Sequence, residues 1–265
     1  MSSVAAIPAP RLGLFATAML VMGGIVGSGI FMNPHVVAQD APSSASVLLA
    51  WLLGGAVALA GGFVWAELAG LRPGVGGQYA YLRDGVNPAA GFVYGWSNLL
   101  VTQTGGMAAV AVTFARYTHV LSSPPWGEAA TAVAALAALT AINLCGVRAG
   151  SAVQSAFMVL KIAAIGALVV CGLLLAPKAV AMEAAATGQP GPRAFFAAMI
   201  AVLFAYGGWA TATFVSGEIK DTARTLPRAL ILGTAGVVAL YIGVNVACLH
   251  ALGPGVLATY DAPAS

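Results

Sequence analysis

Long apolar segments alternate with short polar connections along this chain. Segments of about 20 or more apolar residues are typical of helices that cross a bilayer. The connections between them carry charges and turn residues, for example RPGVGG at 72–77 and RDGVNP at 83–88. We therefore predict seven membrane spans, at residues 12–39, 45–71, 90–116, 128–147, 151–176, 194–216 and 227–252.

The composition indicates a chain that is solvated mainly by lipid. Its 265 residues are 60% hydrophobic and only 7% charged, and the mean hydropathy is +0.92. A soluble globular domain carries about 25% charged residues, so this chain has too few charges to cover a surface in water. We expect an all-α membrane protein in which residues 1–265 belong to a single transmembrane domain.

Lysine and arginine residues predict the orientation of the chain, because cytoplasmic loops are enriched in them. If the N-terminus is cytoplasmic, seven basic residues fall on the inside and three on the outside. The inner set is Arg11, Arg72, Arg83, Arg148, Lys220, Arg224 and Arg228, and the outer set is Arg116, Lys178 and Arg193. This bias predicts a multi-pass protein of the cell (inner) membrane with a cytoplasmic N-terminus.

The first and sixth segments both contain helix-breaking residues near their middle. The first includes VMGGIVGSGIFMNPH, and its 28 residues would measure about 42 Å as one helix, against a hydrocarbon core of about 30 Å. The sixth includes FAYGGW at 204–209. One interpretation is that these glycines do no more than let neighbouring helices pack closely. Since both segments are interrupted, we favour two discontinuous helices, with Pro34 in the first turn of the second half of helix one.

A break at membrane depth is tolerated where it is buried in protein or lines a cavity. Free N–H groups at the start of a half-helix attract a carboxylate, and free carbonyl groups at the end of the other half suit an ammonium group. One break therefore offers partners to both poles of an amino acid. Interruptions at corresponding positions in two repeats are the best sequence pointer to the substrate site of a transporter.

Lys161 lies ten residues into the fifth segment, between apolar neighbours. A lysine at the centre of a membrane helix costs about 2.5–3.5 kcal/mol on insertion scales, so it is a functional candidate by default. The alternative is that its side chain extends to the interface, at a distance of about 15 Å. We favour the functional role. In span three, Asn98, Gln103 and Thr104 line a pathway or make hydrogen bonds between helices.

Other classes of protein find little support. The spans contain no paired carboxylates, Ser/His dyad or HExxH motif, so we expect no enzyme. Three cysteines and three histidines show no metal-ligand spacing, and no basic cluster points to nucleic acid. A retinal-type receptor would need its lysine on helix seven. We expect no cofactor or metal, name an amino acid and the lipid bilayer as partners, and leave the oligomeric state open.

Several motifs, in order along the chain, resemble one known family. They are GIVGSGIF, ELAGLRPGVGGQYAYLRDGVNPAAGFVYGW, LFAYGGW and GEIKDTARTLPRALILG. They resemble the amino acid–polyamine–organocation superfamily, most of all the L-type amino acid transporter branch and its prokaryotic relatives. The resemblance implies a LeuT-type inverted repeat, with a complete first repeat (helices 1–5) and a partial second repeat (helices 6–7). Since such permeases have about twelve spans, we expect the chain to be a fragment.

The resemblance also implies roles for individual residues. Backbone amides at the first break would receive the substrate carboxylate, and carbonyls at both breaks would receive its amino group. Phe204 matches an aromatic gate, and Lys161 takes the place of a sodium ion and in some members carries the coupling proton. The implied substrate-binding set is Ile25, Gly27, Ser28, Gly29, Ile30, Phe204, Ala205 and Gly207.

The predicted function is sodium-independent secondary transport of amino acids by alternating access, as proton-coupled symport or as exchange. Two alternatives remain open at this point. One is a transporter of polyamines or other organocations with the same fold. The other is a truncated membrane protein that does not transport.

Overall fold

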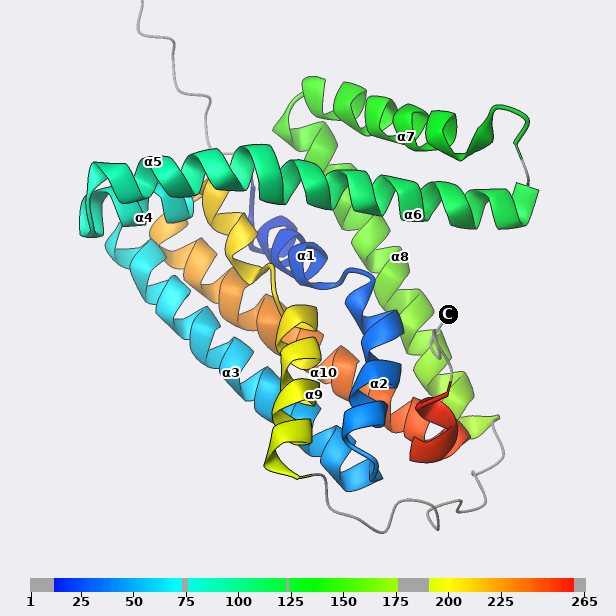
Figure 1. The fold of residues 1–265 in the computed structure, drawn as a ribbon. Coiled ribbons are helices and arrows are strands. Elements are labelled where there is room, and N and C mark those ends of the chain that lie inside the picture. The colour runs from blue at the N-terminus through cyan, green and yellow to red at the C-terminus, as the bar shows by residue number, and fades with distance from the viewer. Residues whose placement is uncertain (1–11, 73–75, 123, 176–190, 260–265) are drawn as a thin grey trace, which may run out of the picture.

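The computed structural model describes residues 12–72, 76–122, 124–175 and 191–259 (Figure 1). Among these residues all elements are helical, apart from an isolated parallel bridge between Leu12 and Ile219, so the all-α prediction is confirmed. In this bridge the Leu12 N–H donates to the Glu218 carbonyl, and the Lys220 N–H donates to the Leu12 carbonyl, both at 2.9 Å. Arg11 and Lys178, which contributed to the predicted orientation, lie outside the described residues.

The helices follow one another in this order: α1 (Leu14–Ile25), α2 (Gly29–Asp40), α3 (Ser44–Leu71), α4 (Gly77–Gly85), α5 (Pro88–Ser97), the π-helix η1 (Asn98–Gln103), α6 (Thr104–Ser122), α7 (Gly127–Leu144), α8 (Val147–Leu174), α9 (Pro192–Ala205), the 3-10 helix η3 (Trp209–Glu218) and α10 (Thr222–Leu257).

The lengths and apolar character of these helices support a multi-pass membrane protein. Within the described residues, five helices are long and apolar enough to cross a bilayer: α3, the continuous run from α5 through η1 to α6, α7, α8 and α10. The pair α1 and α2 passes the same test as a sixth span, bent by 43°. The predicted span at 194–216 corresponds to α9, which has only 14 residues, and to the 3-10 helix that follows it.

Two details of the prediction were wrong. The stretch between spans two and three was expected to be a connection, but it contains α4, which starts after Gly76 turns the chain at a φ of 116°. Pro34 is the sixth residue of α2, beyond its first turn, because α2 begins directly after Ser28. At that position proline removes a helical N–H donor, so α2 lacks one of its internal hydrogen bonds.

Local sequence explains where the helices start. The side chain of Ser43 accepts a hydrogen bond from the Ser46 N–H, and the Ser43 N–H donates to the Ser46 hydroxyl, which forms a capping box at the start of α3. Asn87 caps α5 by accepting from the Ala90 N–H, with Pro88 in the first helical position. Each cap lies at the end of a polar segment that was predicted as a connection, directly before the helix that follows.

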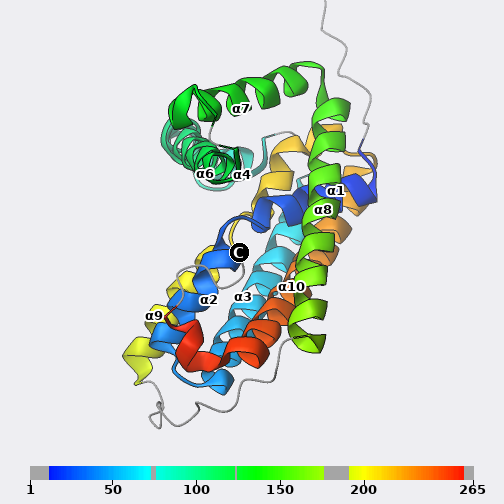
Figure 2. The ribbon, with the colours of Figure 1, turned by 90° about the vertical axis from the view of Figure 1, so that its right-hand side faces the viewer.

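The long helices α3 and α10 pack against each other at the centre of the bundle, with α1, α2 and α9 beside them (Figures 1 and 2). Helices α5, α6 and α7 form a separate layer across one end, and α8 runs along α1 and α10. Buried residues are concentrated in the central pair: 39% of the apolar window of α3 and 44% of that of α10 are buried, against 11% for α8. The centre of the bundle therefore positions the site described next.

Candidate functional site

The first helix break lies between Ile25 and Gly29, where α1 ends and α2 begins. The N–H groups of Ser28, Gly29 and Ile30 have no hydrogen-bond partner within the described part of the chain. Ser28 is exposed and Gly29 half-buried, although Ile30 is buried. Free amides at the start of a helix are an anion-binding arrangement, because the helix dipole adds partial positive charge.

The second break follows α9, and the structure brings it into contact with the first. Gly208 has a φ of 100°, and a Cβ atom added to it would overlap the Gly24 carbonyl. In the reverse direction, a Cβ atom on Gly24 would lie 2.8 Å from the Gly208 carbonyl oxygen. The two backbone segments approach this closely only because neither Gly24 nor Gly208 has a side chain.

Carbonyl groups at the breaks accept hydrogen bonds from the side chains of Lys161 and Tyr241. Lys161 Nζ donates to the Val26 carbonyl at 3.0 Å, although the lysine as a whole retains exposed surface. The Tyr241 hydroxyl lies 3.1 Å from the Ile25 carbonyl and 3.2 Å from the Ala205 carbonyl. The carbonyls at the breaks were predicted to receive the amino group of a substrate. In this structure, those of Ile25 and Ala205 are instead in contact with the Tyr241 hydroxyl.

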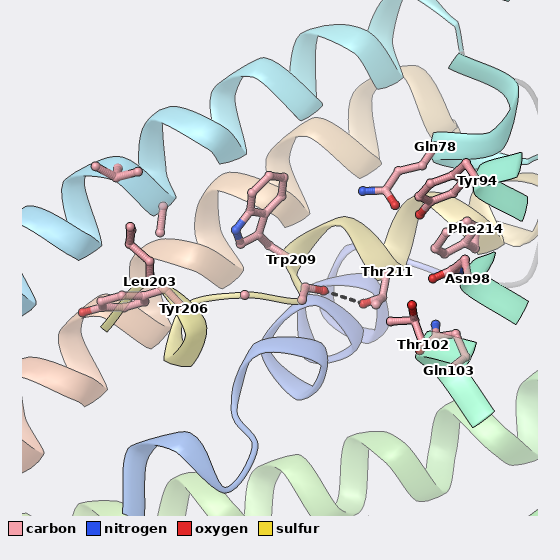
Figure 3. A pocket seen from close by; sticks show the side chains of 14 residues that line it. Gln78, Tyr94, Asn98, Thr102, Gln103, Leu203, Tyr206, Trp209, Thr211 and Phe214 are labelled. Atoms are coloured by element: carbon pink, nitrogen blue, oxygen red, sulfur yellow. Dashed lines mark hydrogen bonds between the residues drawn. The ribbon is translucent and has the colours of Figure 1, made fainter. Parts of the chain in front are cut away.

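A cavity of about 410 Å³ lies beside the second break, between α3, α4, α5, η1, α9 and η3 (Figure 3). Figure 3 shows Asn98, Thr102 and Gln103 of the third span close to Thr211, whose hydroxyl donates to the Gly208 carbonyl at 2.7 Å. The remaining lining residues are Val57, Ala58, Gln78, Tyr94, Leu203, Tyr206, Gly207, Gly208, Trp209 and Phe214. None of the lining side chains is charged.

The predicted site residues are only partly brought together in this cavity. Gly207 lines it, whereas Ser28 and Gly29 belong to the adjacent first break. Phe204 does not line it and is 79% exposed. Ala205 is buried against Gly29, since a Cβ atom on Gly29 would lie 3.2 Å from the Ala205 Cα atom. The structure therefore joins the two breaks and leaves Phe204 outside the cavity.

The π-helix η1 explains why several polar residues of span three share one cavity. At about 100° per residue in an α-helix, residues 98 and 103 would lie roughly 140° apart around the axis. In a π-helix the bonding from i to i+5 brings residues five apart closer to one face. Asn98 and Gln103 were among the predicted pathway residues and Thr102 was missed, while Thr104 donates to the Leu100 carbonyl at 2.6 Å and does not line the cavity.

Two neighbouring charged side chains of α4 pair with each other. On α4, Arg83 donates to Asp84 at 2.7 Å, and this hydrogen bond holds the pKa of the Asp84 carboxyl below its usual value. The Arg83 guanidinium also lies 5.7 Å from the centre of the Tyr79 ring. No group of three or more His, Cys, Asp or Glu side chains gathers as a metal site in the described ranges.

Two touching helix breaks in a bundle of apolar helices, next to an uncharged polar cavity, are an arrangement typical of membrane transporters. The chain belongs to the amino acid permease family, whose model matches residues 12–263. This match confirms the resemblance to amino acid permeases inferred from the sequence motifs. The family is one of permeases, and the relatives described next are named as an exchanger and as transporters, not as enzymes.

Three relatives show how much of such a protein the chain covers. It is 34% identical over 252 residues to the serine/threonine exchanger SteT of Bacillus subtilis, covering 94% of this chain and 57% of the relative. It is 31% identical to the human large neutral amino acids transporter small subunit 2, covering 96% and 50%. It is 29% identical to the human b(0,+)-type amino acid transporter 1, covering 89% and 50%. The chain thus spans about half the length of these curated relatives.

Proposed function

We propose that the protein is a secondary transporter that carries amino acids across the cell membrane by alternating access, with its N-terminus in the cytoplasm. The observation that carries the proposal is the contact between two helix breaks in a chain of the amino acid permease family. In this proposal the fold is a LeuT-type inverted repeat. The chain supplies all of the first repeat, helices 1–5, and helices 6–7 of the second.

The first break is the proposed site for the substrate carboxylate. The free N–H groups of Ser28, Gly29 and Ile30 support this role, since they point from the start of α2 with the positive end of the helix dipole. Gly27 lies next to them with no atom within 4 Å of an added Cβ, so the backbone there is open. The substrate amino group takes a position between the breaks, near the carbonyl groups of 204–207.

The cavity beside the second break is the proposed site for the substrate side chain. It offers amide and hydroxyl groups from Asn98, Thr102, Gln103 and Thr211, and no charged side chain lines it. A polyamine or another cation would need a carboxylate partner to offset its desolvation. The uncharged lining therefore favours neutral amino acids, such as the serine, threonine and large neutral amino acids in the names of two relatives.

Lys161 is the proposed replacement for a bound sodium ion. Its ammonium group already contacts the Val26 carbonyl at the end of the first half-helix, which is where a cation would bind the free carbonyls. Transport would then be independent of sodium, either as exchange or coupled to a proton carried by the lysine. Phe204, exposed at the end of α9, is the proposed gate.

Uptake into proteoliposomes tests this function. The whole protein, as the cell makes it, is reconstituted and supplied with labelled serine, threonine, leucine, arginine and putrescine. The measurement is made with and without a pH gradient, with and without internal amino acid, and with sodium or choline. We expect saturable uptake of neutral amino acids that does not need sodium. Uptake of putrescine alone would replace the proposal by its organocation alternative, and no saturable uptake would overturn it.

Changes in the cavity are expected to alter affinity without altering the fold. Gln103→Ala and Asn98→Ala remove polar groups that line the cavity, so we expect KM for a hydroxyl amino acid such as serine to rise about fivefold, the value of one hydrogen bond. Thr104→Ala is the matched control, because its hydroxyl bonds to its own helix. Initial uptake rates over a range of serine concentrations measure the effect. Equal KM values in all variants would exclude the cavity from the substrate site.

A further inference from the structure

We propose that His35 and Gln39 form a pH-sensitive contact that holds the outer end of α2 against the end of α10 and weakens when His35 takes up a second proton. The proposal rests on the transport function and the orientation proposed above, since α2 then runs from the first break to the outside of the membrane. The last turn of α10 lies beside α2 in both views (Figures 1 and 2). The bonds described next are called the outer contact.

The outer contact consists of three hydrogen bonds. His35 Nδ1 lies 3.3 Å from the Leu257 carbonyl oxygen, and Gln39 Nε2 lies 3.4 Å from the Ala258 carbonyl oxygen. Gln39 Nε2 also lies 3.0 Å from His35 Nε2, one turn away on α2. Two of the bonds therefore cross from α2 to the end of α10, and the third joins the two side chains.

The donors and acceptors of the outer contact require an uncharged His35. A carbonyl oxygen only accepts, so Nδ1 donates its proton to the Leu257 carbonyl. The Gln39 amide nitrogen donates to the Ala258 carbonyl, and it can only donate to His35 as well, so His35 Nε2 is an acceptor. A histidine that donates from one ring nitrogen and accepts at the other carries no charge.

A second proton on His35 removes part of the outer contact. The new N–H group at Nε2 would point at the N–H groups of Gln39. If the Gln39 amide turns to present its oxygen, that oxygen takes the place of the nitrogen beside the Ala258 carbonyl, and this bond to α10 is lost. Histidine changes its charge between about pH 5 and 8, so the contact is complete at the alkaline end of this range and weakens as the pH falls.

Two features confine this effect to the end of α10. Gly253 has a φ of 71° and a ψ of 164°, a conformation open almost only to glycine, and it separates the last turn of α10 from the rest of the helix. In contrast, α2 is joined to α9 by Asn33, whose amide does not titrate and donates to the Ala201 carbonyl at 2.7 Å. At acidic pH, the last turn of α10 can therefore leave α2 while α2 stays against α9.

Other charged or titratable side chains belong to the elements packed against α2. On the outer halves of these elements, within the described ranges, they are Asp40 on α2 itself, His250 on α10 and Arg193 at the start of α9, and residues 44–66 of α3 have none. A nearby carboxylate favours the charged form of a histidine, and a nearby cation opposes it. These groups can shift the pH at which the outer contact changes, but they do not reverse the direction of the change.

The rate of thiol labelling tests the outer contact independently of transport. The whole protein, made cysteine-free and carrying Ala258→Cys, is expressed in cells and labelled from outside with a membrane-impermeant reagent at pH 8 and pH 5.5. Each rate is divided by that of Gly255→Cys, an exposed position with no atom within 4 Å of an added Cβ, which corrects for the reactivity of the thiol itself. We expect the corrected rate to rise at least threefold at pH 5.5.

Two substitutions make opposite predictions about this response. His35→Asn keeps a donor for the Leu257 carbonyl but does not titrate, so the corrected rate should not depend on pH. Gln39→Glu supplies a carboxylate that accepts from the protonated histidine, so labelling should become slower at pH 5.5 than at pH 8. The matched controls are His119→Asn, at another histidine, and Asp40→Asn, and both should keep the threefold rise. A rise that persists in His35→Asn, or that Gln39→Glu does not reverse, overturns the proposal.

Serine exchange connects the outer contact to transport. With serine on both sides of proteoliposomes and no pH gradient, we expect the ratio of exchange rates at pH 5.5 and pH 8 to differ at least twofold between the unmutated protein and His35→Asn. Equal ratios would overturn a role of the contact in transport. If the unmutated protein exchanges and takes up no amino acid, the proposed function fails, and the labelling rates still decide whether the contact responds to pH.

Discussion

Replacing Gly208 with alanine is expected to abolish transport and to destabilise the protein. The residue has a φ of 100°, which costs an L side chain roughly 1–2 kcal/mol. Its added methyl group would also overlap the Gly24 carbonyl, and a backbone atom cannot move aside as a flexible side chain can. We expect uptake to fall to background and the thermal midpoint in detergent to drop by about 5 °C or more.

Gly166→Ala provides the control for this experiment. Gly166 lies inside α8, and no atom is found within 4 Å of a Cβ atom added there. Alanine in a helix interior is more favourable than glycine by about 1 kcal/mol, so the midpoint should stay the same or rise slightly. Normal uptake by the Gly208→Ala variant would show that the two breaks do not need their close contact.

Replacing Lys161 with methionine is expected to give the second large effect. Methionine has a similar length, but it cannot donate to the Val26 carbonyl. Hydrogen bonds of charged groups contribute about 1.5–3 kcal/mol, which corresponds to a loss of roughly 10- to 100-fold. We expect the rate of serine uptake to fall within that range and to lose its dependence on an imposed pH gradient.

The neighbouring variant Leu160→Met controls for changes to the surface of α8. Leu160 is 64% exposed and is expected to contact lipid, so this change should leave uptake unaltered. An uptake rate and pH dependence in Lys161→Met equal to those of the unmutated protein would remove the lysine from the mechanism.

The sequence predicted those parts of the fold that depend on composition along one segment. Long apolar runs marked α3, α7 and α8 to within a few residues, and the glycines near Ser28 marked the place where α1 ends. The helix α4 was missed because a short polar helix differs little in composition from a connection. The π-helix was missed for a similar reason, since NLLVTQ contains no residue that demands a wider turn.

The candidate site was predictable only where a residue was unusual in its surroundings. Lys161 is conspicuous because a charge in an apolar helix is costly, and its contact at the first break agrees with that reasoning. Tyr241 is an ordinary residue for a membrane helix, and its contact with Ile25 joins positions 216 residues apart. Local patterns do not carry such a contact, because it is created by the packing of α10 against the ends of α1 and α9.

The bridge between Leu12 and Ile219 has a mechanical consequence. Two backbone hydrogen bonds join Leu12, two residues before α1, to the end of η3, just ahead of α10. At the opposite ends of α1 and η3, Gly24 and Gly208 are in contact. The helices α1 and η3 therefore contact each other at both ends, and we expect them to move as one rigid unit. Such a movement would displace both breaks together, and the backbone would have to bend in the segments that flank this unit.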